Sequence, residues 1–290
     1  MEKTCKSTAD CKEEKMFFIK KNNFSIIECK KCGSRYTEIY EVENHVAEIY
    51  SDEYFFEGKD GYPNYLNEKD ILYNYGNRYA KIIAQHSNPG KVLDTGCAAG
   101  FILKGFVDRG WEGYGIEPND TMASYGRNEL NLNISTGTLE NYESPEKFDL
   151  INMIQVIGHF YDLDKAMLKV SGLLNKDGLV LVESWNMKSN IARLLGRHWH
   201  EYSPPSVIQW FSDETLTELF RYYGFELISK GYPPKKINVE HALSLVEGKL
   251  FNFFFKKRLF SVFNHLFGKF NINYPPLDLK WYIFRKLDRN

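Results

Sequence analysis

The sequence lacks a long hydrophobic run, and this absence limits the classes of protein to which the chain can belong. No apolar stretch among the 290 residues approaches the ~20 residues that a membrane-spanning helix needs. Residues 1–15 are polar and contain no apolar segment of the kind found in secretory signal peptides. The sequence therefore predicts a cytoplasmic protein without a transmembrane segment.

An excess of charge of one sign is also lacking, because 37 Lys and Arg residues accompany 38 Asp and Glu residues. Proteins that bind nucleic acids usually carry a basic excess, so the charge balance disfavours a nucleic-acid partner. Apolar residues make up 43% of the chain and aromatic residues 16%, which is enough for a sizeable core. The length suggests one full domain and a smaller one.

Cysteine is scarce, and four of the five cysteines lie near the start of the chain. In a cytoplasmic protein such cysteines are more often metal ligands than disulfide partners. Cys29 and Cys32 are separated by two residues and followed by a glycine, which suits a turn around one ion. Cys5 and Cys11 are available to complete a structural zinc site, although their spacing is wider than usual. The alternative is four thiols that bind no metal.

From residue 91 onward, short apolar runs alternate with segments of helical periodicity. This alternation predicts a parallel sheet with crossover helices. The expected strands are 91–94, 113–117, 134–136, 148–155, 179–184, 225–229 and 279–286. The expected helices are 101–109, 120–130, 163–174 and 213–223, the last preceded by Ser212 as its N-cap.

A glycine-rich loop, Asp94-Thr95-Gly96-Cys97-Ala98-Ala99-Gly100, joins the first of these strands to a helix. Small side chains let a ligand approach the backbone, and the start of the helix offers free N–H groups. Asp94 would repel a pyrophosphate but attract a cationic ligand. The glycine spacing also differs from that of dinucleotide-binding loops. The loop by itself is equally compatible with an ordinary tight turn.

Glu117 ends the next expected strand. An acid at a strand tip about 20 residues beyond such a loop can bind the two ribose hydroxyls of a nucleoside. A nucleoside that carries a positive charge and no pyrophosphate describes S-adenosylmethionine. Without the loop, Glu117 would more simply be a solvated acid at the end of a strand.

Together these motifs resemble those of the class I, Rossmann-like S-adenosylmethionine-dependent methyltransferases. Residues 92–100 are similar to the first motif of that family, and residues 114–118 to the second. Residues 148–151 resemble its fourth strand, and residues 173–178 the turn before its fifth. The resemblance covers about residues 77–233, and the sequence is similar to the sugar, natural-product and ubiquinone-biosynthesis type of these methyltransferases.

The resemblance implies an α/β fold with a seven-stranded sheet that ends in an antiparallel hairpin of residues 225–229 and 281–286. It implies that the loop holds the methionine part, that Glu117 binds the ribose, and that residues 137–140 lie beside the adenine. Ala98 is a departure, because the family often has a third glycine there. The implied cofactor-binding residues are Asp94, Gly96, Cys97, Ala98, Gly100, Glu117, Pro118, Thr138, Leu139 and Gln155.

The expected domain organisation has five parts. A zinc-ribbon-like module at residues 1–45 precedes a linker or lid segment at 46–76, which is rich in tyrosine and acids. The methyltransferase core covers residues 77–235 and is completed by a final strand within 277–290. Residues 236–276 would form a helical insertion between the last two strands.

A hydroxyl acceptor would require a general base, for which histidine is the usual choice. His159 follows the fourth strand at the carboxyl edge of the sheet, where ligands bind in such folds. Many relatives have a Glu-His pair here, whereas this chain has Gly158 before the histidine. The alternative is a histidine that only packs within its loop.

His198 and His200 are further candidates, because the segment after the fifth strand would lie over the cofactor. Similar sequences have a Glu-His pair shortly before an aromatic-Ser element, but this chain has Ser206-Val207 there. The two histidines are therefore substitutes by position only. Their alternation with Trp199 also suits a half-buried strand or a packed loop.

Aromatic and basic residues are concentrated late in the chain, at residues 249–270. Phe251, Phe255, Leu259 and Phe263 share one face of an expected helix. Such a helix can lie on an anionic membrane, or it can pack on its own core or on a second subunit of a homodimer. The packing alternative is favoured.

The leading functional hypothesis is a methyltransferase that acts on a small molecule or glycan precursor, with a sugar-like hydroxyl as acceptor. One alternative is a nucleic-acid methyltransferase whose zinc module binds RNA, which the balanced charge disfavours. A second alternative is an S-adenosylmethionine-binding protein without catalysis, which Gly158 and Val207 would suit.

Overall fold

The computed structural model describes residues 15–37, 42–57, 62, 64–233, 236–238, 271–273 and 278–288. Cys5, Cys11 and the aromatic-basic segment 249–270 lie outside these residues. The chain divides into two units, Met1–Gly231 with Asp278–Asn290, and Tyr232–Leu277. In the second unit, β11 (Lys236–Asn238) pairs antiparallel with β12 (Asn271–Asn273). The five-part division of the chain stays a prediction.

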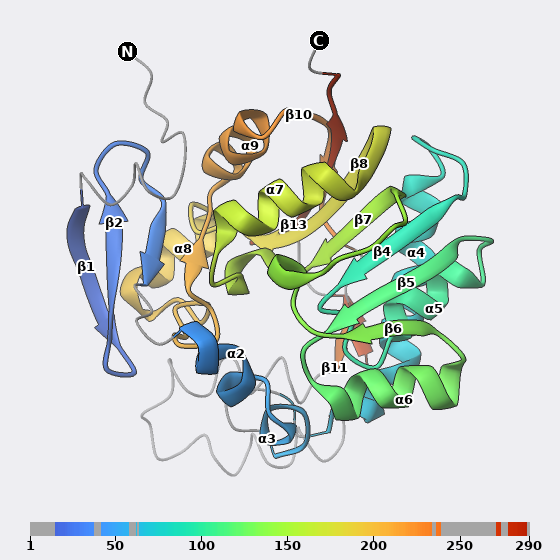
Figure 1. Ribbon diagram of the computed structural model, residues 1–290. Coiled ribbons are helices and arrows are strands. Elements are labelled where there is room, and N and C mark those ends of the chain that lie inside the picture. The colour runs from blue at the N-terminus through green and yellow to red at the C-terminus, as the bar shows by residue number, and fades with distance from the viewer. Residues whose placement is uncertain are drawn as a thin grey trace. The chain divides into compact units, whose positions relative to one another are not determined.

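A seven-stranded sheet is the centre of the first unit, with the strand order β10-β13-β8-β7-β4-β5-β6 (Figure 1). Six strands run in the same direction, and β13 alone among the seven runs antiparallel to them, between β8 and β10. The predicted Rossmann-like sheet with its antiparallel hairpin is thereby confirmed. The strands are β4 (Lys91–Thr95), β5 (Glu112–Glu117), β6 (Asn133–Thr136), β7 (Phe148–Ile154), β8 (Leu174–Trp185), β10 (Phe225–Gly231) and β13 (Leu279–Lys286).

Helices cover both faces of this sheet (Figure 1). Side chains of α4 (Lys69–Ile83), α5 (Phe101–Val107) and α6 (Asp120–Leu130) share one buried core with one face of the strands. Side chains of α7 (Leu163–Leu173) and α9 (Asp213–Tyr222) share the other core. Because both faces are covered, the central strands are continuous apolar runs rather than alternating ones.

The start of β8 differs from the prediction. The sequence predicts helix through residue 174 and a strand from 179, whereas α7 ends at Leu173 and β8 begins at Leu174. Leu174 pairs with Phe148 of β7, and the register shifts before Leu179 pairs with Leu150. Asp177 has a positive φ of 58° in this irregular stretch. The residues predicted to form a turn between the helix and the strand therefore lie within the strand.

Two glycines bring α4 and α5 into close contact. A methyl group on Gly76 would collide with the carbonyl oxygen of Ile102, and one on Gly105 would lie 2.6 Å from the carbonyl oxygen of Tyr73. The two helix backbones can approach this closely only because neither position has a side chain. The contact fixes α5, whose N-terminus follows the glycine-rich loop.

A smaller sheet is formed by β1 (Lys15–Lys21), β2 (Phe24–Cys29) and β3 (Arg35–Thr37), to which β9 (Gln209–Trp210) adds as the fourth strand. β9 belongs to a segment after β8, so the N-terminal strands are fixed to the region beside the main sheet (Figure 1). That segment also contains α8 (Asn190–Leu195) and the 3-10 helix η4 (Gly196–His198).

Five short helices border the carboxyl edge of the main sheet. α2 (Val42–Ile49) and α3 (Asp52–Phe56) precede the 3-10 helix η1 (Tyr65–Glu68), and all three lie between β3 and α4 in the sequence. The 3-10 helices η2 (Leu139–Asn141) and η3 (Ile157–His159) follow β6 and β7. No helix within the described ranges is long and apolar enough to cross a membrane.

Candidate active site

The main cavity of the first unit lies at the carboxyl ends of β4, β5, β6 and β7. Loops that follow these four strands form its floor, and residues of α2, α3 and η1 form much of the rest. Nine of the ten predicted cofactor-binding residues line it. They are Asp94, Gly96, Cys97, Ala98, Glu117, Pro118, Thr138, Leu139 and Gln155, and the predicted base His159 lines it as well.

Gly100 is the predicted cofactor residue that is not among those lining this cavity. It is the N-cap of α5 and has a φ of +80°, a conformation that favours glycine. A methyl group there would lie 2.5 Å from Leu132 and 3.0 Å from Ile134. Its local role is to let the loop turn into α5 against these two side chains.

Glu117 holds the glycine-rich loop through its carboxylate. Oε2 accepts a 2.8 Å hydrogen bond from the backbone N–H of Ala98, and Oε1 accepts one of 2.8 Å from the N–H of Asn119. Glu117 is only 3% exposed, and burial raises its pKa to about 7 against the opposing effect of these two N–H groups. The acid therefore both lines the cavity and fixes the loop beside it.

Asp94 is the second buried acid of the cavity. Burial raises its pKa to about 7; the side chain of Asn152 opposes this effect and the charge of Glu117 adds to it. The pKa of Cys97 is also raised, by burial and by the two acids, so its thiol stays neutral. Two carboxyl groups that titrate near neutrality thus lie in one cavity, where a cation would stabilise their ionised forms.

Gln155 is held at the end of β7 by a buried hydrogen-bonded group. Its side-chain amide donates a 2.7 Å hydrogen bond to Glu183 Oε1, and the Tyr79 hydroxyl donates to Glu183 Oε2. Gln155 has a φ of +58°, a conformation that costs energy in any residue with a side chain. The surrounding bonds therefore keep this side chain in place at the cavity wall.

Aromatic residues from the segment before the core cover the cavity, and residue-level reasoning from the sequence missed them. Their rings form a chain of edge-to-face contacts, and Tyr65 stacks on Phe101 of α5 at 5.8 Å. The available signal was the high tyrosine content of residues 46–76. The residues are Tyr50, Tyr54, Phe55, Tyr62 and Tyr65.

His159 lies in η3, where its ring is held from one side. Nδ1 lies 2.7 Å from the backbone oxygen of Ser206 and 2.8 Å from the hydroxyl oxygen of Tyr50. Burial lowers the pKa of His159, opposed by the Ser206 carbonyl, the charge of Glu201 and the Gln155 carbonyl. A neutral imidazole is favoured at this position.

A second cavity adjoins the main one and shares Tyr54, Gln155 and His159 with it. Two glutamates, two tryptophans and several uncharged polar side chains line it. None of its lining residues within the described ranges is Lys or Arg. The remaining residues are Ile157, Gly158, Glu183, Ser184, Trp185, Glu201, Ser203, Ser206, Val207, Gln209 and Trp210.

The other two predicted histidines lie in the segment after β8 that contains α8 and η4. His198 is exposed at the end of η4. The His200 ring packs edge-to-face on Trp185 at 5.0 Å, and its Nε2 lies 3.2 Å from Glu201 Oε1. Neither histidine is among the residues that line the two cavities.

The Cys29–Cys32 turn has the backbone shape of a metal knuckle. The N–H of Gly33 donates to the oxygen of Cys29 at 2.8 Å, and Gly33 has a φ of +76°. Cys29 is buried at the end of β2, and Cys32 Sγ lies 2.8 Å from Ser34 Oγ. Within the part of the chain that the structure describes, no three His, Cys, Asp or Glu residues are grouped to hold a metal ion.

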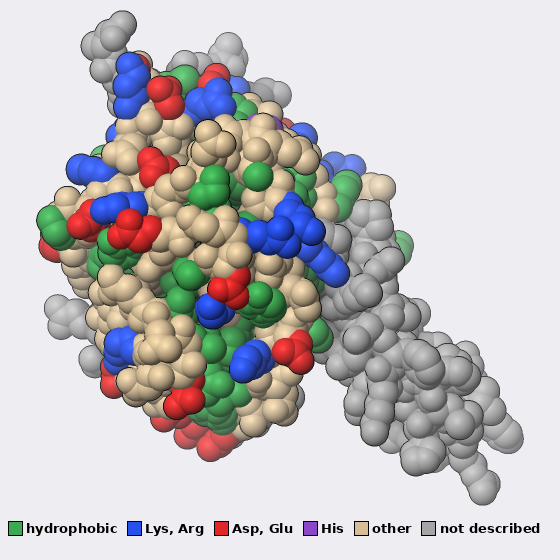
Figure 2. Space-filling view, turned by 90° about the vertical axis from the view of Figure 1, so that its right-hand side faces the viewer, with side chains coloured by type: hydrophobic (Ala, Val, Ile, Leu, Met, Phe, Trp, Pro, Cys, Tyr) green, Lys and Arg blue, Asp and Glu red, His purple; other side chains and the backbone are tan. Residues whose placement is uncertain are grey.

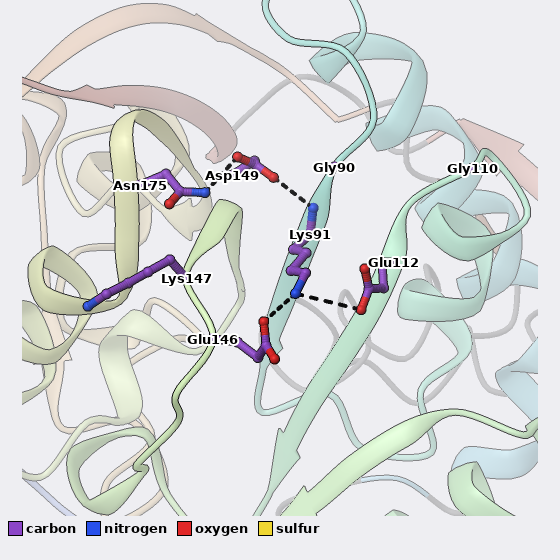
Figure 3. Close-up of a pocket in the computed structure, with 8 residues that line it drawn as sticks. All are labelled: Gly90, Lys91, Gly110, Glu112, Glu146, Lys147, Asp149 and Asn175. Atoms are coloured by element: carbon purple, nitrogen blue, oxygen red, sulfur yellow. Dashed lines mark hydrogen bonds and ion pairs between the residues drawn. The ribbon is translucent and has the colours of Figure 1, made fainter.

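A third hollow lies at the opposite, amino edge of the sheet (Figure 3). Its charged groups already bind one another: Lys91 Nζ contacts Glu146 and Glu112, and Asp149 Oδ2 accepts from the Lys91 N–H at 2.8 Å. Asn175 donates to the other oxygen of Asp149 at 2.8 Å. These pairs join the beginnings of β4, β5 and β7, so the hollow has an evident structural role.

The fold is that of a Rossmann-like α/β protein whose main cavity lies beside the glycine-rich loop, and comparison with known sequences identifies its family. The chain belongs to the methyltransferase domain family, whose model matches residues 68–230, more than half of the chain. The match contains the loop, Glu117, Gln155 and His159, and all the residues that line the two cavities except those from Val46 to Tyr65. The chain therefore contains a methyltransferase domain.

Several relatives and solved structures are similar to this chain. The ubiquinone biosynthesis O-methyltransferase of Rhodopseudomonas palustris (strain HaA2) is 26% identical over 147 residues, 48% of this chain and 58% of the relative. The chain thus spans little more than half the length of such curated relatives.

Two solved structures with bound S-adenosylhomocysteine share the fold. Magnesium protoporphyrin IX methyltransferase from Synechocystis PCC 6803 has a TM-score of 0.54 and 12% identity, with 83% of this chain and 99% of that chain covered. The 1,6-didemethyltoxoflavin-N1-methyltransferase of Burkholderia thailandensis has the same TM-score and identity, with 88% and 96% covered.

Proposed function

We propose that the protein transfers the methyl group of S-adenosylmethionine to a hydroxyl group of a small, ring-shaped molecule, with a sugar-like ring as the favoured acceptor. The observation that carries the proposal is the convergence of the glycine-rich loop, Asp94 and Glu117 in one cavity at the carboxyl edge of the sheet. The cofactor supplies a methyl group on a sulfonium, which leaves the protein to bind and orient two partners.

The residues of the main cavity fit this cofactor by their chemistry. Ionised Asp94 attracts the ammonium of the methionine part, and the carboxylate of Glu117 accepts from the ribose hydroxyls. The small residues Gly96 and Ala98 leave room for close approach to the backbone. Thr138 and Leu139 would lie beside the adenine. The Oγ1 atom of Thr138 is buried without a hydrogen-bond partner, which leaves it available to a ligand.

We assign the second cavity to the acceptor, because it adjoins the main cavity at three shared residues. Its two glutamates would repel a phosphate or carboxylate and accept hydrogen bonds from hydroxyl groups. Trp185 and Trp210 offer apolar surface to the faces of a ring. An uncharged ring with several hydroxyl groups matches this lining better than an anionic acceptor does.

His159 is the proposed general base, because it lies at the junction of the two cavities. Its Nδ1 atom is turned toward the Ser206 carbonyl, which leaves Nε2 to remove the proton of the attacking hydroxyl. His198 and His200 line neither cavity, and their role as bases stays a prediction.

Label transfer tests the proposal directly. The protein is incubated with S-adenosylmethionine carrying a labelled methyl group and two panels of acceptors, methyl glycosides and catechols. We expect label in an ether of a neutral glycoside. Transfer to a catechol alone would move the assignment to the quinone-precursor class, which the name of the Rhodopseudomonas palustris relative suggests. Bound cofactor without transfer to any acceptor would favour the binding protein without catalysis.

The surface gives little support to a nucleic-acid acceptor. Over the face shown in Figure 2, Lys and Arg side chains are interspersed with Asp and Glu side chains. A protein that binds along a phosphate backbone needs a stripe of positive charge.

A cytoplasmic location and a homodimer stay predictions.

A structural zinc ion at Cys5, Cys11, Cys29 and Cys32 stays a proposal that is supported by the turn at Gly33. Metal analysis of the purified protein should give one zinc per chain. The paired substitutions Cys29→Ser and Cys32→Ser should remove the zinc, whereas Cys97→Ser should retain it. Zinc-free wild-type protein that remains folded would contradict the proposal.

A further inference from the structure

Tyr50 connects the aromatic cover to the predicted base. It lies between α2 and α3, outside the matched family region, and it is separated from His159 by 109 positions. Its hydroxyl oxygen lies 2.8 Å from His159 Nδ1 and 3.2 Å from the backbone oxygen of Ser206. The three groups form a compact triangle, in which Tyr50 and His159 line the main cavity and Ser206 lines the second one.

The distances decide where the protons of this triangle lie. A carbonyl oxygen only accepts hydrogen bonds, so a 2.7 Å separation between the Ser206 oxygen and Nδ1 requires hydrogen on Nδ1. The Tyr50 hydroxyl then donates to the same carbonyl, and its oxygen can accept a share of the Nδ1 hydrogen. In the neutral ring, Nε2 is consequently unprotonated.

We infer that Tyr50 is a positioning residue that holds His159 in the Nδ1–H tautomer, so that Nε2 can serve as the base. Only the role of Nε2 as a general base rests on the proposed function. The tautomer is a property of the protein without substrate. When Nε2 takes a proton, the Tyr50 and Ser206 oxygens both face the resulting charge and stabilise it.

Contacts with the residues that follow β5 fix the position of Tyr50. The side-chain amide of Asn119 donates to the backbone oxygen of Tyr50 at 3.0 Å and to Asp52 Oδ1 at 2.9 Å. Thr121 donates to the other carboxylate oxygen of Asp52 at 3.1 Å. The backbone N–H of Asn119 is in turn bound by Glu117 at 2.8 Å. The position of Tyr50 therefore depends on the segment that follows Glu117, the proposed ribose-binding acid at the end of β5.

Two further titratable groups act on this histidine. His45 of α2 is buried; burial lowers its pKa, Glu48 opposes this, and His159 lowers it further. Glu201, from the segment after η4, raises the pKa of His159. Both remain in place when only the Tyr50 hydroxyl is removed, so a change in that variant reports on Tyr50.

Nitrogen-15 spectra of histidine-labelled protein test the inference without an acceptor. In the wild-type protein near pH 8, His159 should show a protonated Nδ1 and an unprotonated Nε2. Tyr50→Phe removes one oxygen that stabilises the imidazolium, so the pKa of His159 should fall by roughly 0.5–1 unit. The population of the Nε2–H tautomer should rise in the same variant.

A rise in the pKa of His159 in Tyr50→Phe would overturn the inference. If the Tyr50 hydroxyl instead donates to an unprotonated Nδ1, wild-type His159 will show Nε2–H and Tyr50→Phe will not lower its pKa. An unchanged tautomer and pKa in Tyr50→Phe would also overturn it. Tyr73→Phe is the matched control, because it removes a hydroxyl that bonds Asp108 at 2.9 Å on the exposed side of α4.

A second variant covers the case in which Tyr50→Phe does not fold. Asp52→Ala removes one acceptor of the Asn119 amide but leaves the Tyr50 hydroxyl, so it should shift the His159 pKa in the same direction by less. If Tyr50→Phe does not fold, an unchanged tautomer and pKa of His159 in folded Asp52→Ala would overturn the inference. Calorimetry with S-adenosylhomocysteine on the same samples separates the two proposals: absent binding with the expected tautomer would reject only the proposed function.

Discussion

The backbone N–H of Ala98 lies 2.8 Å from Glu117 Oε2, and this bond joins the two motifs that define the cofactor site. Ala98 reaches it with a φ of +46°, a left-handed conformation that favours glycine. The departure from glycine that the sequence shows at this position therefore has a physical cost, which the bond to Glu117 offsets.

Ala98→Gly should stabilise the protein by about 0.5–1 kcal/mol. The left-handed conformation costs alanine roughly 1–2 kcal/mol, which glycine would relieve. The greater entropy of glycine in the unfolded chain offsets about half of this gain in stability. Urea unfolding measures the difference. Ala99→Gly is the control, because Ala99 is fully buried and is not in a positive-φ conformation, so this change should only destabilise. Equal effects of the two substitutions would contradict the argument.

The binding of S-adenosylhomocysteine should strengthen as pH rises from about 5.5 to 7.5. Asp94 and Glu117 each have a pKa raised to about 7 by burial, so below that pH both are largely protonated and cannot attract a cation. Each group that must ionise changes the affinity up to tenfold per pH unit. Asp94→Asn should weaken binding at pH 7.5 and reduce the pH dependence. A pH-independent dissociation constant would argue against the role of Asp94.

The stability of the ligand-free protein should fall as pH rises, whereas the affinity for the ligand should increase. A carboxyl group whose pKa is raised by folding favours the folded state below its ordinary pKa, and this contribution is lost as pH rises through about 7. Between pH 5 and 8 the contribution of Asp94 and Glu117 to the free energy of unfolding should therefore fall. Asp94→Asn should show a smaller fall than the wild type in thermal unfolding.

Glu183→Ala should destabilise the protein by about 2–3 kcal/mol. It would leave the buried Tyr79 hydroxyl and the Gln155 amide without their shared acceptor, and an unsatisfied buried donor costs about 1–3 kcal/mol. Glu146→Ala is the comparison: it breaks the pair with Lys91 at the amino edge of the sheet and should destabilise the protein much less than Glu183→Ala does. A smaller loss for Glu183→Ala would show that Gln155 finds another partner.

His159→Gln should lower kcat by about 10²–10⁴ once an acceptor is identified, because it removes a general base. The dissociation constant for S-adenosylhomocysteine should change little. His200→Gln should retain near wild-type kcat, since the His200 ring packs on Trp185 but itself lines neither cavity. A larger loss in His200→Gln than in His159→Gln would reverse the assignment.

The parts of the site that could be predicted are local in sequence. The loop from Asp94 to Gly100 and the acid at Glu117 lie at strand ends whose apolar runs are visible in the sequence, so topology alone places them together. The bond between Ala98 and Glu117 follows from that topology. Pattern and spacing were sufficient here, because parallel strands have their carboxyl ends at one edge of the sheet.

The parts that could not be predicted depend on contacts between distant segments. Tyr50 and His159 are 109 positions apart, and Tyr79 and Glu183 are 104 apart. Neither pair has a spacing or periodicity that reveals it. The tyrosine-rich composition of residues 46–76 indicated a packed segment, but it did not show which ring would reach the histidine. Likewise, the backbone at Gln155 follows from the packing around Glu183.

A calorimetric titration with S-adenosylmethionine at pH 7.5 tests the central claim most directly. We expect one site per chain in the wild-type protein, and a loss of at least tenfold in affinity in Glu117→Ala, which removes the ribose-binding carboxylate and the bond to Ala98 together. Absence of binding by the folded wild-type protein at millimolar ligand, or binding that is indifferent to both Glu117→Ala and Asp94→Ala, would contradict the account.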